Sequence, residues 1–212
     1  MSNWIIFSIG FIAQILFSSR LVVQWITSER QKKVITPTLF WSLSLFASFL
    51  LFIYGYLRED FAIMLGQGLT YFIYIRNLQL QGQWKKFPIL VRYLLLLVPV
   101  LITIYYYNNN VIDRDILFKN EAIPLWLLVL GIISQVVFTF RFVYQWIYSE
   151  YKKESILPLG FWILSLSGSL LILTYAIFRL DPVLFLGHGL GLIIYSRNIY
   201  LIHLSNAENA TE

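Results

Sequence analysis

Apolar residues fill seven long blocks of this chain, and short breaks marked by polar residues, charges or proline separate the blocks. Each block is about 20 residues long or more, the length that an α-helix needs to cross the hydrocarbon core of a bilayer. The pattern therefore predicts seven membrane-spanning helices and an all-α fold. We expect these helices at residues 4–27, 38–57, 61–80, 88–107, 123–148, 159–178 and 182–203.

The composition supports this interpretation and narrows the class of protein. Of the 212 residues, 58% are apolar and 13% are charged, whereas about 25% of residues are charged in ordinary soluble domains. The breaks are too short to hold a water-soluble catalytic domain, which usually needs about 100 residues. Cysteine is absent, which excludes disulfides and thiolate metal sites.

Lysine and arginine are distributed unequally between the two sides that seven crossings would create. One side carries Arg30, Lys32, Lys33, Arg76, Lys85, Lys86, Arg92, Lys152, Lys153 and Arg197. The other side carries Arg58, Arg114, Lys119 and Arg179. Because loops rich in basic residues stay in the cytoplasm, we expect an N-terminus outside the cytoplasm and a C-terminus inside it.

An internal repeat is the strongest signal in the sequence. A shift of 121 residues aligns positions 10–81 with 131–202 without a gap, and about 33 of those 72 positions are identical. The repeat predicts a first triple-helix repeat at 1–81, a linker helix and outer loop at 82–121, a second triple-helix repeat at 122–204 and a polar tail at 205–212. Since three crossings invert the chain, the linker helix would let both repeats point the same way, as in transporters built from parallel repeats.

The first helix of each repeat carries polar residues on one face. Spacings of three or four residues place them on one helical face. The face consists of Gln14, Phe17, Arg20, Gln24 and Ser28 in the first repeat and of Gln135, Phe138, Arg141, Gln145 and Ser149 in the second. If the two faces converge, two guanidinium groups would surround one space, and such groups suit a phosphate, pyrophosphate or carboxylate. Two structural alternatives remain open. The arginines could reach the lipid headgroups, or they could pair with Glu29 or Glu150.

The third helix of each repeat carries a second polar face. It consists of Gln67, Tyr74 and Asn77 in the first repeat and of His188, Tyr195 and Asn198 in the second. Polar residues inside a membrane are costly and commonly functional, so we take all six as candidate ligand contacts. The alternative for His188 is a histidine that is simply hydrogen-bonded at a helix crossing.

Basic residues at the cytoplasmic helix ends form a candidate entrance for anionic headgroups. This set consists of Lys32, Lys153, Arg76 and Arg197. The alternative is that these residues only anchor the protein by the positive-inside rule. No Asp, Glu or Cys lies near His188 or His203 at ligand spacing, so we expect no metal site and no cofactor.

The repeated motifs resemble a known family. The run R-x-x-x-Q-W-x-x-S-E-x-x-K, followed by P-x-x-F-W-x-x-S-x-x-x-S, L-G-x-G and Y-x-R-N, is similar to the lipid A biosynthesis N-terminal domain, in two tandem copies. That membrane domain is named after its occurrence with lipid-A-disaccharide synthase. More distantly, the three-one-three layout resembles the SWEET and PQ-loop superfamily of seven-helix transporters.

The resemblance implies a multi-pass protein of the bacterial inner membrane that acts in lipid A or envelope glycolipid biosynthesis. Because we see no soluble glycosyltransferase region, we do not expect this chain alone to be an enzyme. We expect it to bind or translocate a phosphorylated glycolipid or a polyprenyl phosphate. The alternatives are a SWEET-like sugar facilitator and a membrane anchor or scaffold for a glycosyltransferase partner. We expect membrane lipids as partners and no nucleic acid.

Overall fold

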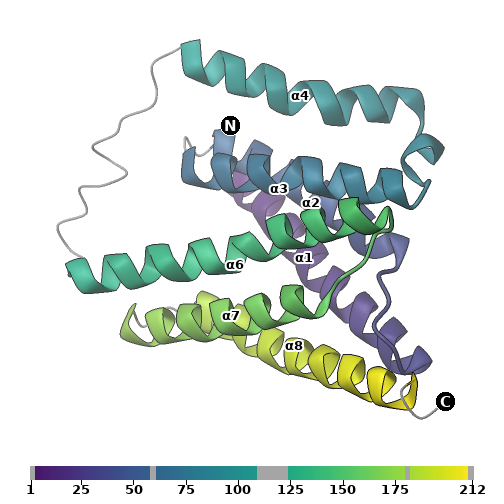
Figure 1. Ribbon diagram of the computed structural model, residues 1–212. Helices are drawn as coiled ribbons and strands as arrows, with labels where there is room; N and C mark the ends of the chain where they lie inside the picture. The colour runs from purple at the N-terminus through teal and green to yellow at the C-terminus, as the bar shows by residue number, and fades with distance from the viewer. Residues whose placement is uncertain (1–2, 58–60, 109–123, 180–181, 210–212) are drawn as a thin grey trace. The chain divides into compact units, whose positions relative to one another are not determined.

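The computed structural model describes residues 3–57, 61–108, 124–179 and 182–209, and these residues are helical apart from short connections (Figure 1). The described elements are α1 (Asn3–Gln31), α2 (Thr38–Leu57), α3 (Phe61–Leu80), the 3-10 turn η1 (Trp84–Lys86), α4 (Ile89–Asn108), α6 (Leu125–Lys152), α7 (Leu159–Arg179) and α8 (Pro182–Asn209). The predicted all-α class is confirmed, and each apolar block corresponds to one α-helix. Arg58, Arg114 and Lys119 lie outside the described residues.

The helix ends differ from the predicted ones where polar residues follow an apolar block. The first helix continues to Gln31, the α6 helix to Lys152 and the α8 helix to Asn209, so part of the predicted tail is helical. Polar side chains do not interrupt the backbone hydrogen bonds of a helix. The apolar pattern therefore marks the part of a helix suited to the membrane and not its full length.

Four of the described helices are long and apolar enough to cross a membrane. These four helices are Trp4–Gln31, Thr38–Leu57, Leu125–Lys152 and Leu159–Phe178. A shorter apolar helix covers Ile89–Tyr105. Long apolar helices with large apolar side chains on their outer surfaces, such as Phe11 and Val136, are typical of lipid-facing segments. The described helices therefore indicate a multi-pass membrane protein.

The chain divides into two compact units, and the division passes through α1. The first unit comprises residues 1–22 and 38–120, and the second comprises residues 23–37 and 121–212. The last turns of α1 and the loop after it thus pack with the second sequence repeat.

The two repeats share packing details as well as sequence. In the first unit a Cβ atom added to Gly10 of α1 would lie 2.9 Å from the ring of Tyr54 of α2. In the second unit a Cβ atom at Gly131 of α6 would lie 2.9 Å from the ring of Tyr175 of α7. Small residues let membrane helices approach closely, and here each glycine makes room for the same tyrosine of the following helix.

Candidate functional site

Arg20 of α1 lies inside the first unit, where side chains of all three helices of the first repeat enclose it. Its Nη1 atom donates to Ser44 Oγ of α2 at 2.8 Å and to the Tyr74 hydroxyl of α3 at 3.3 Å. Only 6% of Arg20 is exposed. A charged side chain this far from water is costly unless its surroundings hold it in a defined geometry.

Aromatic rings also surround Arg20. The guanidinium carbon lies 4.7 Å from the ring centre of Phe17 and 5.3 Å from that of Phe40. The ring of Tyr74 follows at 5.6 Å. These distances are typical of cation–π contacts, which are attractive by about 2 kcal/mol or more once desolvated. We call Arg20, Phe17, Phe40, Ser44 and Tyr74 the Arg20 cage.

The second unit builds a similar site, in which Phe142 stands at the position that Leu21 occupies in the first repeat. Arg141 of α6 is 5% exposed, and its Nη1 atom donates to the Tyr195 hydroxyl of α8 at 3.2 Å. Its guanidinium carbon lies 3.4 Å from the ring centre of Phe138, 4.8 Å from that of Phe142 and 5.6 Å from that of Phe161. We call Arg141, Phe138, Phe142, Phe161 and Tyr195 the Arg141 cage. The contact of an arginine with a tyrosine two helices later, which was not predicted, thus occurs once in each unit.

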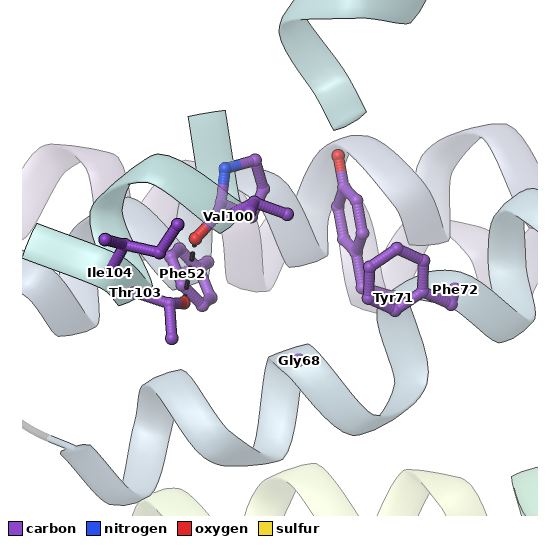
Figure 2. A pocket seen from close by; sticks show the side chains of 8 residues that line it. Phe52, Gly68, Tyr71, Phe72, Val100, Thr103 and Ile104 are labelled. Atoms are coloured by element: carbon purple, nitrogen blue, oxygen red, sulfur yellow. Dashed lines mark hydrogen bonds between the residues drawn. The ribbon is translucent and has the colours of Figure 1, made fainter. Parts of the chain in front are cut away.

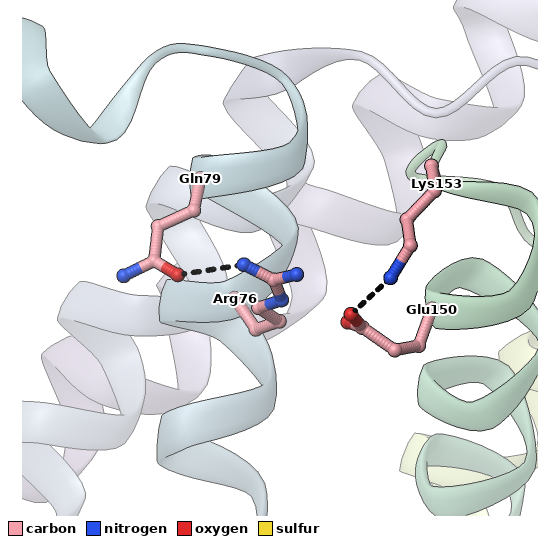
Figure 3. A network of polar contacts seen from close by, with 4 residues as sticks. All are labelled: Arg76, Gln79, Glu150 and Lys153. Atoms are coloured by element: carbon pink, nitrogen blue, oxygen red, sulfur yellow. Dashed lines mark hydrogen bonds and ion pairs between the residues drawn. The ribbon is translucent and has the colours of Figure 1, made fainter.

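The two acidic residues considered as partners of these arginines bind surface cations. Glu29 accepts from Arg197 Nε at 2.8 Å, and a second short contact joins Glu29 to Arg197 Nη2. Glu150 accepts from Lys153 Nζ at 2.8 Å, a pair drawn in Figure 3. The burial of Arg20 and Arg141 also differs from that of a side chain that reaches out to lipid headgroups.

The two glutamines of the predicted arginine face hold the loops that follow their helices. Gln24 Nε2 donates to Ser28 Oγ at 2.9 Å, and the same oxygen accepts from the backbone N–H of Ile35 at 3.0 Å. In the second repeat, Gln145 Nε2 donates to Ser149 Oγ at 2.8 Å and to a loop carbonyl at 2.9 Å. These amides therefore satisfy backbone groups of the loops after α1 and α6.

Gln24 also pairs with an asparagine 174 positions away in the sequence, within the second unit. Gln24 Nε2 donates to Asn198 Oδ1 at 2.8 Å, and Asn198 Nδ2 donates back to Gln24 Oε1 at 3.2 Å. Both side chains are fully buried. Asn77 of α3 is buried too and donates to the carbonyl of Ile73 at 2.9 Å. The asparagines thus take part in hydrogen bonds within the protein.

The remaining predicted ligand contacts lie outside the cages. Gln14 and Gln135 are exposed, and Gln67 is half-buried on α3. His188 Nδ1 lies 3.0 Å from Ser169 Oγ of α7, and its ring packs edge-on against Phe138. This hydrogen bond matches the structural alternative for His188, although the contact with Phe138 joins the histidine to the Arg141 cage.

The predicted entrance residues lie at helix ends. Lys32 and Lys153 are exposed, and both have left-handed backbones, with φ of 52° and 56°. Arg76 and Arg197 are half-buried. The Arg76 Nη1 atom donates to Gln79 Oε1 at 3.3 Å (Figure 3).

Ser44, a partner of Arg20, was not among the predicted site residues. Its signal was the repetition of Phe40 and Ser44 as Phe161 and Ser165, four residues apart on the second helix of each repeat. The described residues contain no group of three metal-ligating side chains, His, Cys, Asp or Glu, that could hold an ion.

Comparison with known proteins gives a consistent relationship. The family model described as Lipid A Biosynthesis N-terminal domain matches residues 9–79 and again residues 130–200. A protein named lipid-A-disaccharide synthase from Chlamydia felis (strain Fe/C-56) is 31% identical over 94% of this chain. Proteins with the same name from Chlamydia caviae and Chlamydia pneumoniae are each 30% identical over 94% of this chain.

The match covers only part of each relative. This chain spans about a third of their length, since the aligned region is 33% of the C. felis and C. caviae proteins and 34% of the C. pneumoniae protein. No solved structure matches this chain. Two copies of one domain model, covering more than half of the residues, show that the chain belongs to the lipid A biosynthesis N-terminal domain family.

Proposed function

We propose that this protein is a membrane component of lipid A or envelope glycolipid biosynthesis that binds a phosphorylated glycolipid or a polyprenyl phosphate. The observation that carries the proposal is the arginine cage, which each repeat builds around an equivalent arginine and an equivalent tyrosine. In this proposal the Arg20 and Arg141 cages bind the anionic headgroup. Translocation of the bound lipid would be a further step of the same activity.

The chemistry of the cages supports an anionic ligand. Tyrosine hydroxyls in both cages, and Ser44 in the Arg20 cage, orient a guanidinium group without removing its positive charge, and the surrounding rings restrict its rotation. A preorganised guanidinium presents a planar fork of donors that matches the oxygen atoms of a phosphate. Because water is largely excluded, a phosphate that entered the cage would interact more strongly than at the protein surface.

The backbone at the two lysines gives independent support. A left-handed conformation costs roughly 1–2 kcal/mol for a residue with a side chain, and glycine or asparagine would avoid most of that cost. Lysine occupies this position in both repeats, at Lys32 and Lys153. The left-handed residue ends its helix, since the Lys153 N–H donates to the Ser149 carbonyl, and an exposed amine at a helix end can attract anionic headgroups.

The proposal includes a layout in the bacterial inner membrane. All seven helices cross the bilayer, the two triplets run parallel as in the SWEET and PQ-loop superfamily, and α4 links them. Tyr71 of α3, hydrogen-bonded to the backbone of α4, joins the linker to the first triplet. The N-terminus is outside the cytoplasm and the C-terminus is inside it.

Binding to purified protein in nanodiscs tests the proposal. We expect saturable binding of polyprenyl phosphate or of a phosphorylated lipid A precursor. Arg20→Gln and Arg141→Gln should each weaken it at least about tenfold, which corresponds to about 1.4 kcal/mol. Lys85→Gln, which removes one exposed charge from η1, is the control and should bind as the unchanged protein does. Absence of saturable binding, or equal affinity in the arginine variants, would overturn the proposal.

A second candidate function is that of a membrane module for a partner glycosyltransferase. The observation that favours it is the length of the relatives, which are named lipid-A-disaccharide synthase. About two thirds of the residues of the C. felis protein lie outside the matched region. Co-purification of a glycosyltransferase with both this protein and its Arg20→Gln and Arg141→Gln variants would favour this function. Uptake of labelled neutral sugar by proteoliposomes would instead favour a sugar facilitator.

A further inference from the structure

The first unit contains an apolar pocket that the arginine cages do not use. Its volume is about 250 Å³, larger than the cavity of about 150 Å³ that admits a benzene molecule in an engineered protein. The pocket lies where three helices meet (Figure 2). Its lining consists of Phe52 of α2, Gly68, Tyr71 and Phe72 of α3, and Pro99, Val100, Thr103 and Ile104 of α4.

Proline in α4 explains why α3 and α4 are held together beside this pocket. Pro99 has no N–H, so the carbonyl of Leu95 loses the helical hydrogen bond that it would otherwise accept. The Tyr71 hydroxyl of α3 donates to this carbonyl at 2.7 Å. An unsatisfied carbonyl inside a membrane costs several kcal/mol, so the tyrosine both satisfies α4 and fixes it against α3.

The pocket offers little to a polar ligand or to water. Tyr71 and Thr103 are the lining residues that carry hydroxyl groups, and both hydroxyls already donate to α4 carbonyls. The Thr103 hydroxyl donates to the backbone carbonyl of Pro99 at 2.8 Å, as the dashed line in Figure 2 shows. A buried water needs two to four polar partners. The lining is therefore suited to a hydrocarbon group.

The mouth of the pocket lies on the surface of the first unit. Phe72 is 54% exposed, Val100 43% and Ile104 53%. Pro99 is the eleventh residue of the 20-residue helix α4, which places it about 15 Å from either end at 1.5 Å per residue. In a membrane-spanning α4 this is the depth of the hydrocarbon core, where lipid acyl chains surround a helix.

We propose that this pocket binds one acyl chain of a membrane phospholipid. The chain enters from the bilayer between α3 and α4 and occupies the space beside Gly68, where an added Cβ atom would meet no atom within 4 Å. The equivalent glycine of the second repeat, Gly189, also has open space. However, leucine stands at position 192, the equivalent of Tyr71, so α8 carries no hydroxyl there.

Photo-crosslinking of the whole protein in nanodiscs tests this site. The probe is a phosphatidylcholine with a diazirine in the middle of one acyl chain, and mass spectrometry locates the adducts. We expect adducts on Tyr71, Phe72 or Val100 to exceed those on Leu90 and Leu97, which are exposed on α4. Gly68→Leu fills the pocket and should reduce the pocket adducts at least about fivefold. Gly189→Leu is the matched control and should leave them unchanged.

Three results would overturn the proposal. One is a pocket adduct yield that Gly68→Leu leaves unchanged, and another is a yield no higher than that on Leu90 and Leu97. The third is displacement of the probe by polyprenyl phosphate but not by unlabelled phosphatidylcholine, which would assign the pocket to an isoprenoid chain. If Gly68→Leu does not fold, Val100→Phe fills the pocket from α4 instead. Because Arg20→Gln should not change the adducts, failure here is separable from failure of headgroup binding.

Discussion

In each arginine cage, a tyrosine hydroxyl and aromatic rings orient a charged group. A guanidinium in a low-dielectric site is stabilised by hydroxyl acceptors and by aromatic faces. In each cage, one tyrosine supplies a hydroxyl group and an aromatic face. Tyr74 contacts Arg20 through its hydroxyl and through its ring, and Tyr195 does the same for Arg141. The tyrosine hydroxyl is therefore the part of the cage whose removal is most informative.

Tyr74→Phe and Tyr195→Phe should each destabilise the protein by about 1.5–3 kcal/mol, the usual contribution of a hydrogen bond to a charged group. The ring contact stays in both variants, so the loss reports the hydroxyl alone. Thermal unfolding in detergent measures the effect. Tyr93→Phe, at an exposed tyrosine of α4, is the control and should leave the melting temperature unchanged. Equal melting temperatures for all of these variants would contradict our description of the cages.

The contact between Tyr71 and Leu95 makes a second prediction. Tyr71→Phe should cost about 1–3 kcal/mol, because it leaves a buried carbonyl unsatisfied. In a Pro99→Ala background the alanine N–H can form the helical hydrogen bond to Leu95, so the same substitution should cost much less. Unfolding of the four proteins in a double-mutant cycle measures the coupling. Additive effects would show that the tyrosine does not compensate for the proline.

At the scale of the helices, the two repeats differ in how closely their first two helices approach. In the second unit a Cβ atom on Gly168 of α7 would lie 2.8 Å from the backbone of Phe138 on α6. The equivalent residue of the first repeat is Ala47, which is fully buried in α2. The second repeat thus has a close backbone approach that only glycine permits, and it lies next to a ring of the Arg141 cage.

Gly168→Ala should therefore destabilise the protein by about 1–3 kcal/mol through overpacking. Gly189→Ala, where the added Cβ atom meets nothing, should be neutral or stabilising by up to about 1 kcal/mol, because alanine is the better helix former. Thermal unfolding of the two variants separates steric from propensity effects. The expectation fails if the two substitutions shift the melting temperature equally.

Part of this arrangement could be predicted from the sequence at the scale of the helices. The number of helices and their apolar centres follow from block length and composition, because a helix in lipid must be apolar over about 20 residues. Tyr74 and Tyr195 were predicted as candidate ligand contacts because the repeat marks them, but their contacts with the arginines were not predicted. The role of Ser44 and the bond from Tyr71 to α4 were not predicted, since both depend on the rotation of one helix against another.

At the scale of the whole molecule, the distribution of basic residues predicts the orientation. A reporter enzyme that is active only in the cytoplasm should be active when it is fused after Glu212. A reporter that is active only outside the cytoplasm should be active when it is fused before Met1. The physical reason is the retention of loops rich in lysine and arginine on the cytoplasmic side. The opposite assignment of either end would overturn this orientation.

The sequence by itself determined the helical class, the duplication and the membership of the lipid A biosynthesis N-terminal domain family. These follow from composition and from similarity along the chain, which need no knowledge of distant contacts. The tertiary structure alone decided that Gln24 pairs with Asn198 and that the end of α1 packs with the second repeat. It also decided that glutamines on the arginine face hold loops. The reason is that a polar side chain in a bundle takes the partner that helix packing brings within reach, and sequence spacing fixes only the helical face on which it lies.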